Sequence, residues 1–263
     1  MTIIEALILG IVQGLTEFLP ISSSGHIELG KFLLGIKVKD NLLFSVIVHF
    51  ATALSTIVVF RKDIADLLKG LFAFQWNEST QYVSKLIISM IPVGLVGVFF
   101  EDQISAFFDG NILLVGAMLL VTGLLLTFTY YKKDTQKSVS YTKAFIIGIT
   151  QAIAILPGIS RSGTTIATAL LLNVDKAKAA RFSFLMVLAP IIGASLLKLK
   201  DYMEAGTGAG DISTTALLAG FIAAFVSGLL ACQWMIAIVK RGKLIYFAIY
   251  CFIIGFIAIL SMI

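Results

Sequence analysis

Residues 13–26 of this chain read QGLTEFLPISSSGH, and residues 151–164 read QAIAILPGISRSGT, so a similar polar pattern returns 138 positions later. The same offset places Lys62-Asp63 on Lys200-Asp201 without a gap. Gln, Ser, Gly, Lys and Asp rarely match by chance between apolar sequences. The chain is therefore interpreted as a duplication, and a repeat of this kind constrains the fold more than any single segment does.

The composition around these stretches is that of a membrane protein. Hydrophobic residues make up 59% of the 263 residues and charged residues 13%, whereas a soluble domain is roughly half apolar and a quarter charged. The mean hydropathy is +1.00. Several apolar runs approach the roughly 20 residues with which a helix crosses a bilayer, and the period-two alternation of a barrel strand is absent. Helical spans are therefore expected, in the runs 83–100, 112–131, 214–239 and 244–263.

Each half is expected to contain five helical segments. The two short segments that open each half flank a Pro/Gly/Ser break, which favours a re-entrant hairpin buried in protein. Each half then crosses the membrane three times, and an odd number of crossings inverts the second half relative to the first. The predicted fold is an all-α integral membrane protein with an inverted-topology repeat, whose binding site lies where the two breaks meet. The expected segments are 3–19, 26–36, 42–60, 83–100 and 111–131, then 141–156, 164–173, 178–198, 213–239 and 244–262.

The loop charges predict the orientation of these halves. The first repeat is assigned to residues 1–131, a cytoplasmic linker to 132–143 and the second repeat to 144–263. Loops rich in Lys and Arg are expected on the cytoplasmic side, and residues 101–110, which have neither, on the outer side. Both termini then lie outside, and three lysines oppose this arrangement, Lys31, Lys37 and Lys39. The net charge of +5 is spread over short loops, which favours anionic lipid headgroups over nucleic acid as a partner.

The first break carries polar groups that a membrane segment normally avoids. A carboxylate such as Glu17 costs about 2.5–3.5 kcal/mol at the centre of a membrane helix on insertion scales, so it indicates function. Gln13 lies one helical turn earlier on the same face. The next residues supply three hydroxyls, a glycine and an imidazole, namely Ser22, Ser23, Ser24, Gly25 and His26. The structural alternative is that the serines cap a helix and that His26 is hydrogen-bonded in the core.

The second break supplies the opposite charge. Arg161 stands at the position that matches Ser23, and Ile155 at the position that matches Glu17. Arginine binds phosphate through two parallel hydrogen bonds, and helix starts with glycine-rich turns attract anions. If the two breaks meet, they form an asymmetric phosphate site, to which the second break contributes Ser160, Ser162, Gly163 and Thr165. The alternative for Arg161 is a structural ion pair or a side chain that extends to the membrane surface.

Other polar residues are interpreted as structural. His49, with Ser45, is assigned to the core in preference to the cavity. Cys232 and Cys251 lie within apolar segments and suggest packing rather than a metal or a disulfide. Arg181 belongs to a helix start at the inner surface and is not assigned to the site.

The two motifs together resemble the bacterial undecaprenyl-diphosphate phosphatases of the bacitracin-resistance type, and the resemblance extends from end to end. It implies a hydrolase that converts undecaprenyl diphosphate to the monophosphate, the lipid carrier that is reused for peptidoglycan and other wall polymers, and that confers bacitracin resistance. It also implies a multi-pass protein of the bacterial inner (plasma) membrane, with a Mg²⁺ or Ca²⁺ cofactor and a site open to the outer face. Family members carry Glu or Gln at the position of Gln13, and this chain has the amide.

These residues lead to a mechanistic hypothesis. Arg161, the hydroxyls and the amides of both breaks would hold the diphosphate, while Gln13 and Glu17 would bind the divalent cation, or Glu17 would act as general base. Ser23, His26 and water remain alternative nucleophiles. The expected partners are the polyprenyl diphosphate and membrane lipid, with a homodimer as an open question. The alternative function is a polyprenyl-phosphate flippase, because inverted repeats with broken helices are also transporter architecture.

Overall fold

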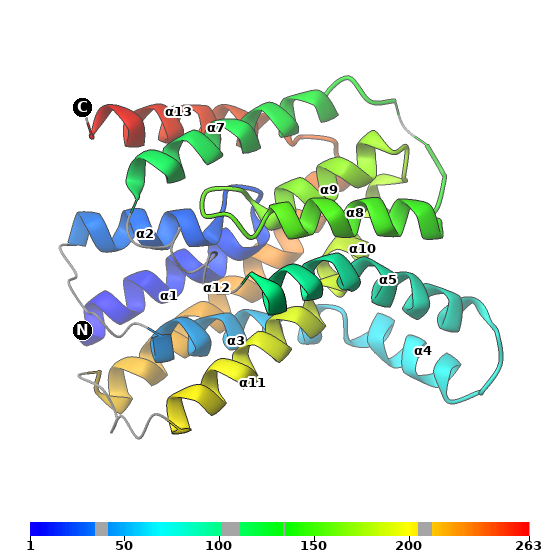
Figure 1. Cartoon of the computed structure of the whole chain (residues 1–263), viewed down its shortest axis with the longest axis horizontal. Helices are drawn as coiled ribbons and strands as arrows, with labels where there is room; N and C mark the ends of the chain where they lie inside the picture. The colour runs from blue at the N-terminus through cyan, green and yellow to red at the C-terminus, as the bar shows by residue number, and fades with distance from the viewer. Residues whose placement is uncertain (35–41, 101–110, 134, 205–211, 263) are drawn as a thin grey trace.

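The computed structural model describes residues 1–34, 42–100, 111–133, 135–204 and 212–262, and within these ranges the chain forms helices and no strands (Figure 1). Lys37, Lys39 and the segment 101–110, all used in the orientation argument, lie outside the described residues. The helices of the first half are α1 (Ile3–Phe18), α2 (Ser23–Leu34), α3 (Leu42–Val59), α4 (Arg61–Leu71), α5 (Glu78–Phe99) and α7 (Ile112–Thr129). Those of the second half are α8 (Tyr141–Ile153), α9 (Arg161–Leu171), α10 (Lys176–Met186), α11 (Leu188–Glu204), α12 (Thr214–Lys240) and α13 (Ile245–Leu260).

The chain is a multi-pass membrane protein. Four helical stretches among the described residues are long and apolar enough to cross a bilayer, and α3 with α4 forms a further candidate that bends by 76°. Large apolar side chains cover the outside of the molecule; Leu95, Val98, Leu230 and Ile253, for example, are each more than half exposed. Such a surface is stable in lipid, where apolar side chains need no burial. The prediction of an all-helical membrane protein is confirmed.

The main differences from the predicted segments concern α10 with α11, the helix α4 and the start of α5. The expected span 178–198 is divided at Val187 into α10 and α11, because Pro190 lacks an amide hydrogen and its ring would crowd the carbonyl of Met186 four residues earlier. The helix α4 was not predicted, since it is polar, with one charged face along Arg61–Leu71. The segment expected at 83–100 begins at Glu78, where the Asn77 side chain caps the first turn by accepting from the Thr80 amide.

In each half, the helix before the break packs against a helix of the other half. The helix α1 packs along α12, and α8 packs along α5, so each helix that precedes a break lies against the other half (Figure 1). The first of these interfaces is built from small residues, with Gly10 against Gly220 and Gly14 against Ser227. Small residues let membrane helices approach closely, which replaces the hydrophobic driving force that lipid does not supply.

The helices α7 and α13 form a third pair and run in opposite directions. Gly116 lies against Gly255, and Gly123, two turns later, lies against Ala248, which comes two turns earlier than Gly255. Figure 1 shows the two helices side by side along one edge of the molecule. By sequence position, these helices are the last expected segment of each half.

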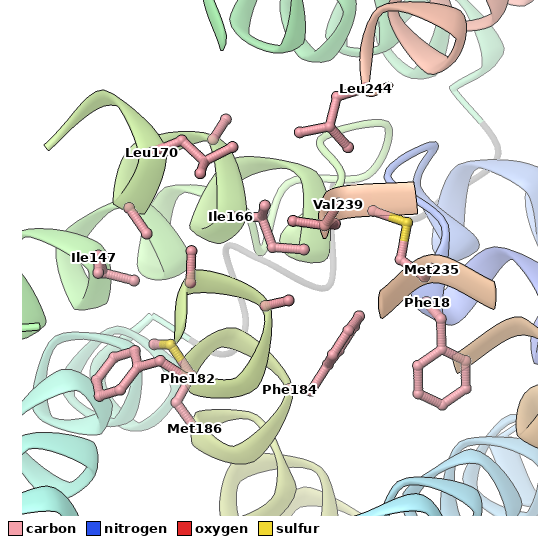
Figure 2. Packing of buried hydrophobic residues seen from close by; sticks show 14 of the residues in the cluster. Phe18, Ile147, Ile166, Leu170, Phe182, Phe184, Met186, Met235, Val239 and Leu244 are labelled. Atoms are coloured by element: carbon pink, nitrogen blue, oxygen red, sulfur yellow. The ribbon is translucent and has the colours of Figure 1, made fainter. Parts of the chain in front are cut away.

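The largest hydrophobic cluster lies between the two halves. It includes side chains from α1, α9, α10 and α12, and Figure 2 shows several of them turned toward one another. Ile166 of α9 is fully buried, as is Val239 of α12. On α10, Phe182 packs edge-on against Tyr82, and Phe184 packs edge-on against Phe18. The cluster thereby holds α1, α9 and α10 in fixed relative positions.

The small-residue contacts give a testable prediction for stability. A Cβ atom at Gly148 of α8 would collide with the backbone carbonyl oxygen of Ser89 in α5. Because a backbone atom cannot rotate away, we expect Gly148→Ala to lower the free energy of unfolding by about 1–3 kcal/mol, the usual cost of overpacking. Unfolding in detergent micelles, followed by circular dichroism, measures this. The control is Gly94→Ala in α5, where a Cβ atom meets nothing within 4 Å; equal behaviour of the two variants would contradict the prediction.

Candidate active site

The two breaks in the helices are in direct contact. The first runs from the end of α1 at Phe18 to the start of α2, and the second from the end of α8 at Ile153 to the start of α9. The Ser162 hydroxyl donates to the Leu19 carbonyl oxygen at 3.2 Å. A Cβ atom at Gly25 would lie 3.3 Å from the Cα of Gly158. The meeting of the two breaks, on which the predicted site depends, is therefore observed.

Serine side chains start both of the helices that follow the breaks. The hydroxyl oxygen of Ser22 accepts from the Gly25 amide at 3.3 Å, and that of Ser160 accepts from the Gly163 amide at 3.0 Å. These contacts satisfy amides that the first turn of a helix leaves without partners. The capping role, which the sequence left as the structural alternative, therefore applies to these two serines and occupies both glycine amides.

Glu17 is the centre of a buried polar cluster. Its side chain is 4% exposed. Carboxylate atom Oε1 accepts from Nη2 of Arg161, which forms an ion pair across the two halves. The other oxygen, Oε2, accepts from Gln13 Nε2 at 2.9 Å and from Ser23 Oγ at 2.8 Å. Residues from α1, α2 and α9 thus converge on one carboxylate, and each buried charge has a charged or hydrogen-bonded partner, as burial requires.

A small pocket opens beside this cluster, lined by residues from α1, α3, α9, α10 and α11. Its polar side includes Arg161, Ser162 and Thr165, and the Thr165 hydroxyl is hydrogen-bonded to that of Ser183. The full lining is Glu17, Phe18, Thr56, Arg161, Ser162, Thr165, Ser183, Phe184, Val187 and Ile191. A charged end and an apolar side in one pocket suit a ligand with a phosphate head and a hydrocarbon tail.

Two polar residues of the lining were not predicted from the sequence. Thr56 lies on α3, and Ser183 lies on α10. The repeat offered a signal for Ser183, because the 138-residue offset matches it to Ser45. Ser45 lies in α3, the same helix as Thr56. Nothing in the sequence distinguishes Thr56 from the other hydroxyl residues of this membrane helix.

His26 makes its contacts away from Glu17. Its Nδ1 lies 2.9 Å from the Ser22 carbonyl oxygen, and its Nε2 lies 2.9 Å from the hydroxyl of Tyr250, whose ring stacks on the imidazole. Both ring nitrogens are therefore engaged, and the hydroxyl of Ser23 is bonded to Glu17 instead of His26. Tyr250 belongs to α13, and no sequence pattern connected it with the first break.

The remaining predicted phosphate-binding residues divide into two groups. Ser162 and Thr165 line the pocket. Ser24 lies at the start of α2, with its hydroxyl 3.4 Å from that of Ser22, and does not line the pocket.

The oxygen atoms around Glu17 fit a divalent cation if a ligand completes the set. In the described part of the chain, no three His, Cys, Asp or Glu side chains gather in one place. Gln13 Oε1, however, is buried without a hydrogen-bond partner. Mg²⁺ is commonly held by one or two carboxylates together with phosphate oxygens of the substrate. Glu17 and Gln13 supply oxygens of this kind, and His49 Nε2 lies 4.0 Å from Glu17 Oε2.

Comparisons with known proteins identify the family of this chain. The family model described as "Bacitracin resistance protein BacA" matches residues 6–257. A protein of Christiangramia forsetii called "Undecaprenyl-diphosphatase" is 58% identical over 262 residues, which cover 99% of this chain and 98% of that protein. Proteins of the same name from Bacteroides fragilis and Bacteroides thetaiotaomicron are 57% and 55% identical, over 97% and 99% of this chain and 96% and 99% of their own lengths. This chain therefore belongs to the bacitracin resistance protein BacA family.

Proposed function

We propose that this chain is an undecaprenyl-diphosphate phosphatase, which releases phosphate from the lipid diphosphate and returns undecaprenyl monophosphate for cell-wall synthesis. The observation that carries the proposal is the Glu17–Arg161 pair, set in a pocket between the two broken helices. The relatives' name supplies the substrate. Removal of the diphosphate, which bacitracin would otherwise bind, accounts for resistance to that antibiotic.

Arg161 is the group best placed to hold the diphosphate. A guanidinium has five N–H donors, so the contact with Glu17 leaves others for phosphate oxygens. The side chain of Arg161 is 29% exposed, whereas that of Glu17 is 4% exposed. The Arg161 guanidinium therefore reaches the pocket, and Ser162 and Thr165 line the same space. Phosphoryl transfer requires this neutralisation of charge on the transferred group.

Ser23 is the proposed nucleophile, with Glu17 as its base. The Ser23 hydroxyl already donates to Glu17 Oε2 at 2.8 Å, which is the nucleophile–base geometry of activated serines. In the proposed reaction an Oγ–P bond forms at the terminal phosphorus, and the bridging P–O bond breaks. The proton passes to Glu17, and undecaprenyl phosphate leaves. Water then cleaves the phosphoserine, which restores Ser23 and releases phosphate.

A divalent cation, Mg²⁺ or Ca²⁺, is part of the proposal. Glu17 and the amide oxygen of Gln13 would hold it. When bound, it supplies positive charge to the oxygens of the diphosphate. The protein contributes the orientation of these ligands, because Glu17 is fixed by Arg161 and Ser23 from the two neighbouring helices.

The inverted repeat is proposed as the architecture of the site, with residues 1–131 and 144–263 as the repeats and 132–143 as the linker. Two observations support it. The contact of Gly25 with Gly158 has a counterpart in the contact of Gly163 with Pro20, and these pairs interchange under the 138-residue offset. In addition, α7 and α13, matching segments of the two halves, run antiparallel. We place the protein in the bacterial inner membrane, with the pocket open to the outer face.

The experiment for this function is phosphate release by the purified protein from undecaprenyl diphosphate in detergent. Wild type should release phosphate, and Ser23→Ala should be at least about 100-fold slower, in the range lost with one catalytic group. Ser84→Ala is the control, because Ser84 bonds to Tyr141 and neither residue lines the pocket. Wild-type release with a Ser23→Ala rate within threefold would point to water as nucleophile.

The runner-up function is lipid transport, which the two touching breaks also favour. Liposomes that report movement of polyprenyl phosphate separate it from hydrolysis. Lipid movement without any phosphate release from the diphosphate would replace the phosphatase proposal by a flippase.

A further inference from the structure

His49 lies on a polar stripe that leads along α3 to the pocket. Ser45, His49, Thr52 and Thr56 are spaced by four, three and four residues, so they share one face of the helix. Thr56 lines the pocket, and His49 lies 4.0 Å from Glu17 through its Nε2 atom. From the sequence, this histidine is expected in the core, but its side chain is 29% exposed, as much as that of Arg161.

The tautomer of His49 follows from its backbone contact. Nδ1 lies 2.8 Å from the carbonyl oxygen of Ser45. A carbonyl oxygen can only accept, so Nδ1 carries the hydrogen. In the neutral ring, Nε2 then presents a lone pair on the side of Glu17. A hydrogen bond from the distal ring nitrogen to a carbonyl is the usual support of a histidine that binds a metal, since it fixes the tautomer and the ring orientation.

We propose that His49 is a third protein ligand of the divalent cation, together with Glu17 and Gln13. The inference rests on the proposed function, because the cation belongs to the same site. It adds a nitrogen ligand to a set that otherwise consists of oxygens.

The distances of His49 and Gln13 from Glu17 Oε2 are compatible with ligands of one ion. Ligand atoms at about 2.0–2.2 Å from a metal lie between about 3 and 4 Å from one another. His49 Nε2 is 4.0 Å from Glu17 Oε2, and the Gln13 amide is 2.9 Å from the same oxygen through Nε2. Rotation of that amide by half a turn exchanges its nitrogen and oxygen. It would bring the unpartnered Oε1 toward Glu17, an arrangement that a cation between the two oxygens stabilises.

A ligand set of this kind changes the expected metal preference. Carboxylate and amide oxygens alone suit Mg²⁺ and Ca²⁺, whereas imidazole suits first-row transition ions. Mn²⁺ accepts oxygen ligands and also binds imidazole, so the site should hold Mn²⁺ more tightly than Mg²⁺ or Ca²⁺. Mn²⁺ is also paramagnetic, which makes the ligands observable without any turnover.

The test is electron spin-echo envelope modulation of Mn²⁺ bound to the purified chain, without substrate and without a polyhistidine tag. The chain has two histidines, so directly coordinated imidazole nitrogen must come from His49 or His26. We expect nitrogen modulation in wild type and in His26→Gln, and its loss in His49→Gln. The dissociation constant for Mn²⁺ should rise about tenfold or more in His49→Gln, at the lower end of what altered metal shells cost.

Three outcomes decide the matter. Nitrogen modulation in His26→Gln, where His49 is the remaining histidine, supports the inference even if His49→Gln fails to fold. Mn²⁺ that binds in a Glu17-dependent manner without nitrogen modulation in wild type overturns it and leaves the phosphatase proposal intact. Nitrogen modulation together with no phosphate release overturns the phosphatase proposal and leaves the metal site standing.

Discussion

Arg161→Lys is expected to slow phosphate release about 100- to 1,000-fold, the loss that follows removal of one well-placed donor to a developing negative charge. Lysine keeps the positive charge beside Glu17, but it has no planar fork with which to hold the carboxylate and the diphosphate at once. The measurement is kcat for undecaprenyl diphosphate in detergent. A rate within threefold of wild type would remove Arg161 from phosphate binding.

The alanine variant separates catalysis from stability. Arg161→Ala leaves Glu17 buried without its cation, and breaking a buried pair on one side costs about 3–5 kcal/mol. A double variant, Arg161→Ala with Glu17→Gln, removes both charges and should recover much of the thermal stability while remaining inactive. If the double variant unfolds at the same temperature as Arg161→Ala, the ion pair is not the source of the loss.

Glu17→Gln is expected to lower kcat about 100- to 10,000-fold, the usual contribution of a general base. The amide keeps the size of the side chain and a hydrogen bond to Gln13 or Ser23, but it cannot take the serine proton or balance the charge of Arg161. The assay is again phosphate release, accompanied by a thermal melt that reports folding.

The matched control is Glu28→Gln on α2, because Glu28 pairs with Lys31 at 2.9 Å and lies outside the pocket lining. Its activity should stay within about twofold of wild type, because an ion pair three residues apart on a helix is worth only about 0.2–0.5 kcal/mol. A folded Glu17→Gln protein with normal activity would transfer the role of base to another group.

Charge and periodicity in the sequence were enough to predict the contact between the two breaks. An acid in one half and a guanidinium in the other both lie at depths where an isolated charge is unstable, so Glu17 and Arg161 had strong physical reason to meet. The segments expected at 26–36 and 164–173 begin three residues earlier than predicted, at Ser23 and Arg161, each directly after a capping serine.

Other features depend on contacts that a linear pattern does not encode. His26 bonds to Tyr250, which lies 224 residues away, and Tyr250 resembles any aromatic residue of an apolar helix. His49 was assigned to the core because a lone histidine in a membrane helix is compatible with either environment; its proximity to Glu17 depends on how α3 is rotated. Pro190 in the sequence signals the break at Val187. The continuous apolar run on both sides of it nevertheless predicts a single span.

The packing of α1 against α12, a helix of the other half, affects how the chain assembles during synthesis. Because a ribosome releases the amino-terminal helix first, α1 enters the membrane when most of the helix that will cover its glycines has yet to be translated. Glu17 likewise arrives more than half a chain before its guanidinium. The nascent first repeat must therefore be tolerated by lipid, or sheltered by the insertion machinery, until the last spans are made. Assembly of the enzyme is in this sense decided at the end of synthesis.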